Sequence, residues 1–435
     1  MKLFYVLFVS LILVVPSWDA VAGNNGDSSP ALSLDEITRA VLENNPSIKS
    51  ALNKWNAMKA RIPQAEAWDD PKLSAQQKLD RFVSIQPNAF ADEMVSVEQM
   101  IPLSGKNRVQ ARIAAIEALQ AFEAARRQEL DVLAKTRASY FELLNVYALI
   151  DLNDQSLATL RQIAQNAASK YESGQAGAAE ALVAEVEADK LIEARRDLER
   201  MLAEEQSRLN VLMNRDAFAP LGRPAEVAFK PGEFAVEKLR TITLAERPEI
   251  KIAAAGVEME KGRVELARRN RVPDPAVMVQ AQRYNDASQA VSEIDAGISI
   301  ELPWMNSRKY SAGIQEANAN LTAATQDLEG ARNEAIGLLR DALQKVETAH
   351  HHLQLFHDKL LPEAQQALQA SQLAYESGKS SFSDWISAQH AVQDLQAMER
   401  QDLTDYQIAL AELEAVTGAD LNFFPRPTPK ERQGK

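Results

Sequence analysis

The sequence predicts a mainly α-helical protein with a small β part of the kind that enters membranes. The composition combines 46% apolar residues with only 16 glycines and 6% aromatics, a mixture typical of long helices. Residues 105–172 contain no proline, so they fit one helix of about 100 Å. Four short segments read as strands, and the last of them alternates: Ile294, Ile298 and Ile300 face one way, Asp295 and Ser299 the other.

The first 22 residues predict export. Lys2 is followed by the apolar run Leu3–Val15 and by the small residues Ala20–Ala22, the pattern of a secretory signal peptide. A buried N-terminal helix is the alternative. No later apolar run approaches the ~18 residues of a transmembrane helix, so the mature chain could enter a membrane only as a closed β-barrel.

Composition excludes several functions. The chain has no cysteine, so it can form neither disulfides nor thiolate metal sites, and it is not a lipoprotein acylated on cysteine. A net charge of −13 without a basic block argues against nucleic-acid binding. No nucleophile motif, phosphate loop or zinc-protease motif occurs, so we expect neither an enzyme nor a cofactor.

The chain contains two copies of one unit, spaced about 200 residues apart. Tyr171-Glu172-Ser173-Gly174, for example, returns as Tyr375-Glu376-Ser377-Gly378. The predicted organisation is a signal peptide (1–22), a first repeat (23–215), a linker (216–235), a second repeat (236–420) and a disordered tail (421–435).

Each repeat is predicted to hold a helix, a strand pair, a long helix and a returning helix. In the first repeat these are residues 33–68, 72–85 with 92–101, 105–172 and 178–214; in the second they are 236–271, 276–286 with 291–302, 307–376 and 383–417. Ser33 and Glu36 form a capping box at the first helix. The two shorter helices of a repeat match the long one in length, so we expect them to stack end to end along it.

The long helices need coiled-coil partners, because they exceed the globular range. In the second repeat a heptad seam meets this need; it comprises Ile336, Leu339, Leu343, Val346, His350, Leu353, His357 and Leu360. Gly174 and Gly378 follow the long helices and are predicted to end them at the helix-reversal tips with positive φ.

Four strands cannot close a barrel, because about eight is the minimum. The strands of several copies must therefore be pooled, which predicts a tube of long helices capped by a shared barrel. The alternative is an exported coiled-coil scaffold or adaptor without a pore. A scaffold does not require an apolar face on the strand Ile294–Leu302, so the channel is favoured.

The mature chain resembles the TolC family of outer-membrane efflux proteins. The resemblance rests on Leu34–Pro46, on the junction Glu98–Lys106, which is most like the heavy-metal efflux branch, and on the two Tyr-Glu-Ser-Gly turns. It implies a homotrimer with a twelve-stranded barrel in the outer membrane and a tunnel of antiparallel coiled-coil helices, an α-barrel, in the periplasm. A periplasmic adaptor and an inner-membrane pump of the RND or ABC type are the implied partners. The implied function is a passive exit duct for efflux or type I secretion, whether of metal ions, drugs, solvents or peptides.

The resemblance also implies a periplasmic gate at the second tip, formed by Asp384 and Tyr375. The sequence departs from the family here, because Ser387 stands where a second acidic ring is known and Ser380 where an arginine is expected. Asp384 has an alternative role as an acidic residue at a helix N-terminus. Glu180 takes the equivalent place in the first tip and is expected to face the adaptor.

The five histidines are His350, His351, His352, His357 and His390. Adjacent residues on a helix point in different directions, so the run His350–His352 is not expected to hold a metal ion. His350 and His357 share the seam but lie roughly 10 Å apart by the helix rise, too far for one ion. A metal site between chains stays open.

Overall fold

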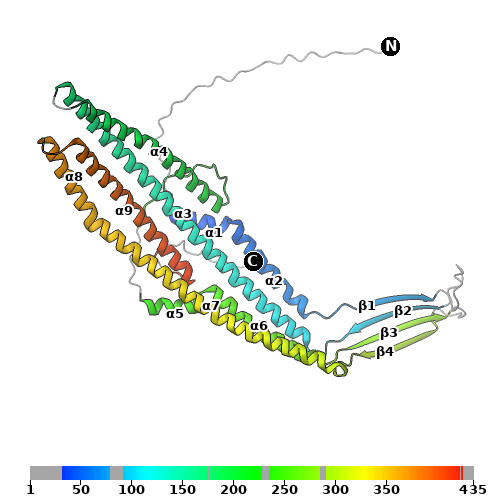
Figure 1. The fold of residues 1–435 in the computed structure, drawn as a ribbon. Coiled ribbons are helices and arrows are strands. Elements are labelled where there is room, and N and C mark those ends of the chain that lie inside the picture. Colours follow the sequence, from blue (N-terminus) through cyan, green and yellow to red (C-terminus); the bar gives the residue numbers. More distant parts are fainter. Residues whose placement is uncertain are drawn as a thin grey trace, which may run out of the picture.

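The computed structural model describes residues 32–78, 92–174, 177–227, 235–284, 291–421 and 423–424. The predicted signal peptide lies outside this part, as do most of the predicted tail and residues 228–234 of the predicted linker. Figure 1 shows a long helical body with a four-stranded sheet at one end and two helix-reversal tips at the other. The predicted mainly helical fold with a small sheet is confirmed.

Both repeats follow the predicted order of elements. The first contributes α1 (Leu34–Asn44), α2 (Pro46–Glu66), β1 (Lys72–Lys78), β2 (Asp92–Met100), α3 (Lys106–Glu172) and α4 (Ala178–Leu212). The second contributes α5 (Val236–Glu246), α6 (Pro248–Arg269), β3 (Pro275–Tyr284), β4 (Glu293–Ile300), a 3₁₀ turn (Pro303–Asn306), α7 (Ser307–Leu355), a π turn (Phe356–Leu360), α8 (Leu361–Glu376) and α9 (Phe382–Thr417). Among the described helices, none is long and apolar enough to cross a membrane.

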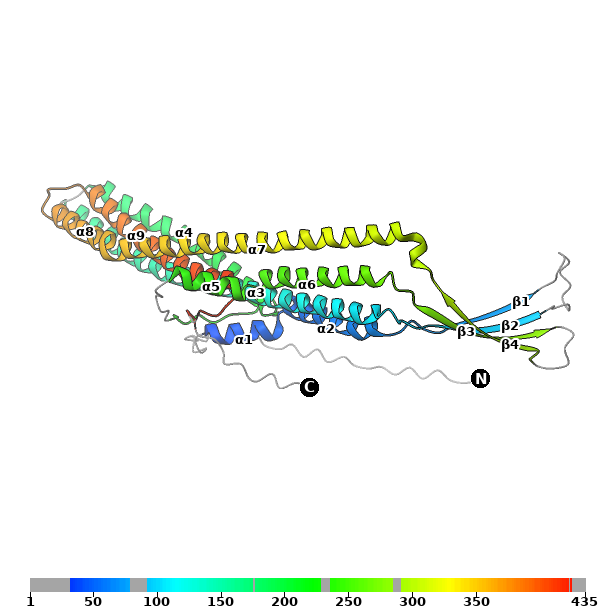
Figure 2. The same ribbon diagram turned by 90° about the horizontal axis from the view of Figure 1, so that it is seen from below.

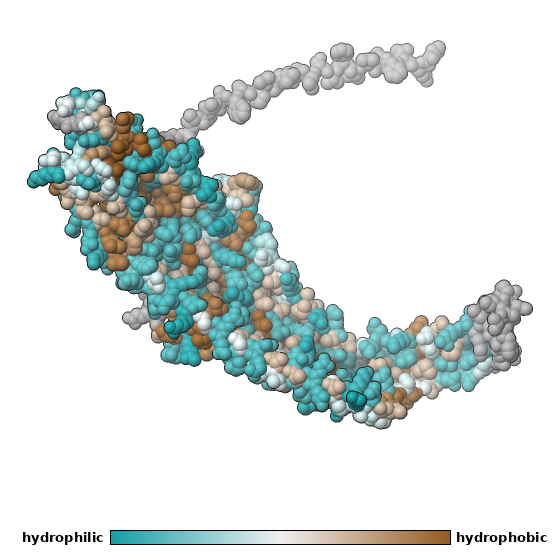
Figure 3. All heavy atoms as spheres, in the orientation of Figure 1, coloured by the Kyte–Doolittle hydropathy of each residue, from teal (hydrophilic) through white to brown (hydrophobic). Residues whose placement is uncertain are grey.

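The strands form one antiparallel sheet in the order β1-β2-β3-β4. Its register places Leu73 opposite Val97, Val97 opposite Val279, and Val279 opposite Ala296. One face of the sheet is therefore apolar across all four strands, and it is exposed: Leu73 has a relative accessibility of 73%. Hydrophobic patches are visible on the strands in Figure 3.

Each strand leads to or from one helix, and the helices keep the order of the strands. Next to the sheet, α2 packs on α3, α3 on α6 and α6 on α7. Farther from the sheet, α4 continues along α3, and α9 packs on α3, α7 and α8 (Figures 1 and 2). The predicted stacking of two shorter helices along each long one is therefore observed.

Two helices predicted as continuous are broken in the structure. Asn45 separates α1 from α2, and Arg247 separates α5 from α6; both have extended backbone, with ψ of 124° and 123°. Each precedes a proline that becomes the first residue of the next helix. The proline ring disfavours helical backbone in the preceding residue but suits the first helical position. Asn45 also caps α2, because its side chain accepts hydrogen bonds from the backbone N–H groups of Ser47 and Ile48.

The long helix of the second repeat is interrupted by the π turn Phe356–Leu360. Pro362 lies just beyond it and lacks the N–H that an α-helix would use, so the turn widens locally. The predicted heptad seam holds for Leu339, Leu343 and Val346, which are buried. It is wrong for His357, which is exposed within the π turn and reaches Glu399 on α9 instead.

Buried side chains gather in two places. The larger core lies at mid-length, where Tyr140, Phe141, Leu410 and Leu413 pack against α1 and α5. Tyr140 donates a 2.6 Å hydrogen bond to the carbonyl oxygen of Ala225, and burial raises its pKa to about 12. The smaller core joins the two hairpins near their tips and comprises Leu160, Ile163, Ala167, Ala184, Ala188, Phe382 and Ile386.

Candidate functional site

The long helices end at the two helix-reversal tips in the same way. Gly174 and Gly378 have φ of +72° and +71°, a conformation in which a Cβ is strained. At the second tip the Gly378 N–H donates to the carbonyl oxygen of Tyr375 (3.0 Å), and the Lys379 N–H donates to that of Ala374 (2.8 Å). These bonds close the end of α8. No atom outside the immediate turn approaches either glycine Cβ position within 4 Å, so only the backbone conformation requires glycine.

Asp384 belongs to the cap of α9. Its Oδ2 accepts hydrogen bonds from the hydroxyls of Ser380 (2.9 Å) and Ser381 (2.8 Å) and from the backbone N–H of Ser381 (3.1 Å). The Asp384 N–H donates to the Ser381 hydroxyl in return, which completes a capping box. The Ser381 hydroxyl, then Ser380, lower the pKa of this carboxyl. Within one chain Asp384 therefore has the helix-capping role that the sequence left open.

Tyr375 connects the second tip to the first. Its hydroxyl donates a 2.5 Å hydrogen bond to the Glu180 carboxylate on α4, and the ammonium of Lys170 on α3 lies 4.5 Å from its ring centroid. On its own hairpin the ring stacks on Trp385 at 5.3 Å and meets Phe382 edge-on at 5.5 Å. Burial, and then the Glu180 carboxylate, raise the pKa of Tyr375 to about 12.

The structure thus brings together Tyr375 and Glu180, whereas Asp384 bonds within its own helix cap. The carboxylate of Glu180, expected to face outward to a partner, points to the second hairpin. Sequence reasoning did not single out Lys170, Phe382 or Trp385. A signal was present, because Tyr375, Phe382 and Trp385 lie on both sides of one glycine turn, where aromatic side chains readily meet.

Three histidines pair with carboxylates on neighbouring helices. His357 Nδ1 lies 2.9 Å from Glu399, and this contact raises the histidine pKa. His390 Nε2 lies 3.3 Å from Glu187, and His352 Nδ1 lies 3.8 Å from Asp402. Among the described residues no three ligand side chains are placed to hold a metal ion. The run His350–His352 therefore presents no metal site within the described part of one chain.

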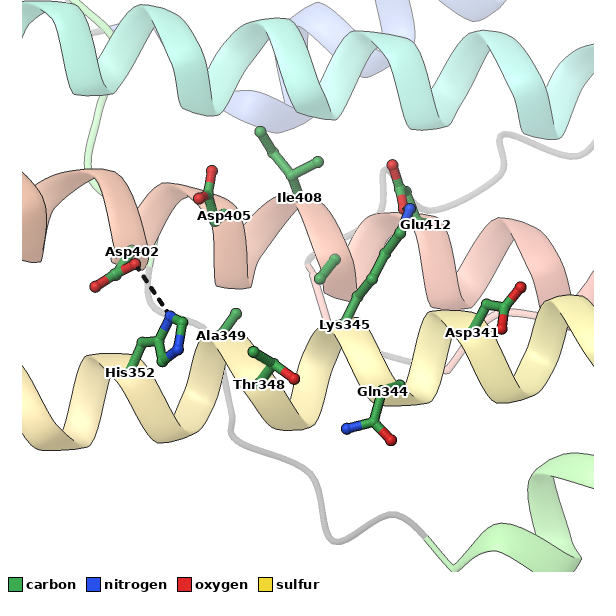
Figure 4. A pocket seen from close by; sticks show the side chains of 11 residues that line it. Asp341, Gln344, Lys345, Thr348, Ala349, His352, Asp402, Asp405, Ile408 and Glu412 are labelled. Atoms are coloured by element: carbon green, nitrogen blue, oxygen red, sulfur yellow. Dashed lines mark hydrogen bonds and ion pairs between the residues drawn. The ribbon is translucent and has the colours of Figure 1, made fainter.

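The groove containing His352 runs between α7 and α9 and has a volume of about 650 Å³. Figure 4 shows His352 facing Asp402 across it and Lys345 extending toward Glu412. The Lys345 ammonium lies 2.7 Å from the Glu412 carboxylate. Two charged pairs of the groove, Lys345 with Glu412 and His352 with Asp402, join α7 to α9.

Comparisons with known proteins support a single family. The profile described as "Outer membrane efflux protein" matches residues 37–215 and 239–419. No curated protein matches the chain. Three solved structures share its fold at low sequence identity.

The first is the transmembrane channel protein CusC, with 16% identity, a TM-score of 0.77, and coverage of 93% of this chain and 97% of that one. The second is the outer membrane protein VceC from Vibrio cholerae, with 17% identity, a TM-score of 0.74, and coverage of 89% and 96%. The third is the MtrE outer membrane channel of Neisseria gonorrhoeae in its open state, with 18% identity, a TM-score of 0.73, and coverage of 89% of each chain.

Proposed function

Because the chain belongs to the outer membrane efflux protein family, we infer that it is an outer-membrane exit duct that reaches into the periplasm. We propose further that it works as a homotrimer, and that a periplasmic adaptor and an inner-membrane pump of the RND or ABC type deliver its substrates. The duct then conducts passively, and the pump supplies the energy. Efflux and type I secretion both fit this arrangement.

The proposal of a trimer rests on the two open edges of the described sheet in each chain. In the described sheet β1 pairs only with β2 and β4 only with β3, so one edge of each remains available. Among the four helices that join the strands, α2 and α7 are the outer two, so they lie on the same sides of the chain as the edge strands β1 and β4. The two edges differ, so copies can join only head to tail, which closes a ring when the rotation between copies allows it. Three copies would pool twelve strands, enough for a barrel.

The exposed apolar face of the sheet supports the membrane location. A soluble scaffold gains nothing from exposing Leu73, Ile294 and Ile298 on one face of the sheet, whereas these residues suit contact with lipid chains. This face is the observation that disfavours the alternative, an exported coiled-coil scaffold or adaptor without a pore.

Light scattering of the detergent-extracted protein tests the assembly. We expect a protein mass three times that of the mature chain, and discrete single-channel conductance after reconstitution into planar bilayers. A folded monomer, or a trimer that conducts no ions, would contradict the proposal.

We propose that the contacts at the tips act as the periplasmic gate. Tyr375 links the two hairpins, and Asp384 caps α9, the helix that follows the second tip. In this proposal Glu180 ties the two hairpins of one chain together, while Gly174 and Gly378 shape the tips that an adaptor meets. The proposal is supported by the 2.5 Å hydrogen bond between Tyr375 and Glu180, which joins the two hairpins next to the tip core.

Removing the phenol should loosen this gate. We expect Tyr375→Phe to raise single-channel conductance and to shorten closures, because the hydrogen bond to Glu180 is lost while the ring stacking remains. The matched control is Tyr171→Phe in the first-repeat turn, whose side chain is exposed and makes no hydrogen bond within the described chain. Equal conductance in wild type and Tyr375→Phe would remove Tyr375 from the gate.

The raised pKa fixes the pH range of this contact. The stabilisation that the protonated Tyr375 hydroxyl gives to the fold is fully present below pH 10, the pKa of an unperturbed tyrosine. It is lost as the pH rises toward the folded pKa of about 12. The hydrogen bond from Tyr375 to Glu180 therefore stays intact over the whole physiological pH range.

A further inference from the structure

The four crossings between the sheet and the helices share an unexpected feature: each exposes a large apolar side chain. These side chains are Trp68 before β1, Leu103 after β2, Val272 before β3, and Trp304 with Met305 after β4. The exposure is substantial, since Trp304 has a relative accessibility of 61% and Met305 one of 80%. We call this set the junction collar.

Exposed cations lie on the helix ends next to the collar. They are Arg108 in the first turn of α3, Arg268 and Arg271 at the end of α6, and Arg308 and Lys309 in the first turn of α7. None of the five forms an ion pair with a carboxylate in the described part of the chain. Nearby cations at the same level do, such as Lys106 with Asp274 at 3.0 Å.

Charge is distributed unevenly along the molecule. The four crossings, residues 60–72, 98–112, 263–275 and 300–312, contain eleven Lys or Arg and seven Asp or Glu. The whole chain contains 48 Lys or Arg and 61 Asp or Glu, a net charge of −13. The junction is thus a positively charged zone on an acidic protein. Of its five exposed cations, Arg271 donates to the Ser311 hydroxyl at 3.0 Å and Lys309 lies over the Tyr310 ring, but these contacts leave the positive charges without a carboxylate partner in the described part of the chain.

The position of this zone indicates which ligand it meets. The collar lies at the end of the sheet that joins the helices, so with the sheet in the membrane it lies where the hydrocarbon of the bilayer ends and the headgroups begin. Tryptophan side chains are enriched at that level because they are apolar with one polar N–H. Cations one turn farther along a helix reach the phosphates of the headgroups, and clusters of such cations attract anionic lipids.

We propose that the junction collar binds anionic phospholipid headgroups in the membrane leaflet that faces the periplasm. Trp68 and Trp304 contact the glycerol and upper acyl region, while the five cations pair with headgroup phosphates. In a ring of copies the crossings of neighbouring chains alternate, which makes the collar a continuous belt. This inference rests on the proposed function, because the sheet must lie in the membrane.

The test uses the assembled protein in bilayers of mixed zwitterionic and anionic phospholipid. Bromine, which quenches tryptophan, is placed on the acyl chains of either the anionic or the zwitterionic component at equal mole fraction. We expect the brominated anionic lipid to quench about twofold more, and the difference to fade in high salt. Replacing both Trp68 and Trp304 by Phe should remove most of the quenching, since Trp55 lies in the middle of α2 and Trp385 in the first turn of α9 at the tip.

Charge variants then test whether the cations next to the junction collar cause the preference for anionic lipid. The fivefold change of Arg108, Arg268, Arg271, Arg308 and Lys309 to Gln should equalise quenching by the two lipids. The control, Lys238→Gln with Arg240→Gln, neutralises two exposed cations on α5 and should leave the preference intact. If the fivefold variant does not assemble, Arg308→Gln with Lys309→Gln should still reduce the preference.

The possible outcomes separate this inference from the proposed function. Equal quenching of the wild type by both lipids would overturn the collar as an anionic-lipid site, yet leave the sheet in the membrane. A preference that survives in the assembled charge variants would also overturn it. Quenching by neither lipid would contradict the membrane location itself, and with it the proposed function.

Discussion

Val279→Lys is expected to reduce the membrane-inserted trimer at least tenfold, whereas Gln280→Lys should be tolerated. Both residues lie at the middle of β3, but their side chains point to opposite faces of the sheet. Val279 is half exposed on the apolar face, beside Val97 and Ala296. A lysine facing lipid near the bilayer midplane costs about 2–4 kcal/mol, and every chain of the proposed trimer would carry one.

The neighbouring position provides a matched control. Gln280 lies between Ser96 and Asp295 on the polar face, which would line the water-filled interior of a barrel. Heat-resistant trimer in outer-membrane fractions measures the effect, and ~1.4 kcal/mol already corresponds to tenfold in an equilibrium. Equal loss in the two variants would show that lipid does not cover the apolar face.

Much of this fold could be predicted because its signals are local and repeated. The strand alternation at Ile294–Ile300 fixes which side chains share a face. The glycines of the two Tyr-Glu-Ser-Gly turns have no Cβ, so their sequence alone indicates the left-handed turn that Gly174 and Gly378 adopt. The second copy of each element reinforced the assignment of the first.

The errors arose where one proline competes with a strong helical pattern. Residues 33–68 have helical spacing throughout, yet Pro46 forces Asn45 into an extended conformation, and Pro248 does the same to Arg247. Pro362 instead produces a π turn, because α7 and α8 remain collinear along α9 and the helix can widen without ending. Sequence does not distinguish these outcomes, since packing partners decide them.

The tip contacts were predictable only in part. The family resemblance singled out Tyr375 as a residue of the second tip, but its partner Glu180 lies 195 residues away. The cap at Asp384, by contrast, is a contact across three residues and was open to local reasoning. Contacts between the repeats depend on how two long hairpins lie side by side, which no local pattern specifies.

The most destabilising single change is expected at Glu414, which lies in the mid-length core. Its carboxylate meets the Arg137 guanidinium at 3.1 Å, joining α9 to α3, and both side chains are nearly inaccessible, at 2% and 4%. The guanidinium carbon also lies 4.9 Å from the ring centroid of Phe424, so the pair also holds the end of the described chain. Such a pair contributes little net stability as a whole, but it is costly to break.

Glu414→Ala should therefore destabilise the fold by about 3–5 kcal/mol, since it leaves the buried Arg137 cation without this carboxylate. Replacing both residues with apolar ones, Arg137→Met with Glu414→Leu, should restore most of the loss because it removes both charges of the pair together. Glu412→Ala is the control: Glu412 lies two residues earlier on α9, and its pair with Lys345 is exposed, so its loss should cost less than about 1 kcal/mol. Thermal unfolding of the purified protein, followed by circular dichroism, compares the three variants with the wild type. If Glu412→Ala and Glu414→Ala unfolded at the same temperature, burial would not govern the strength of these pairs, and the mid-length core would not depend on the Arg137–Glu414 contact.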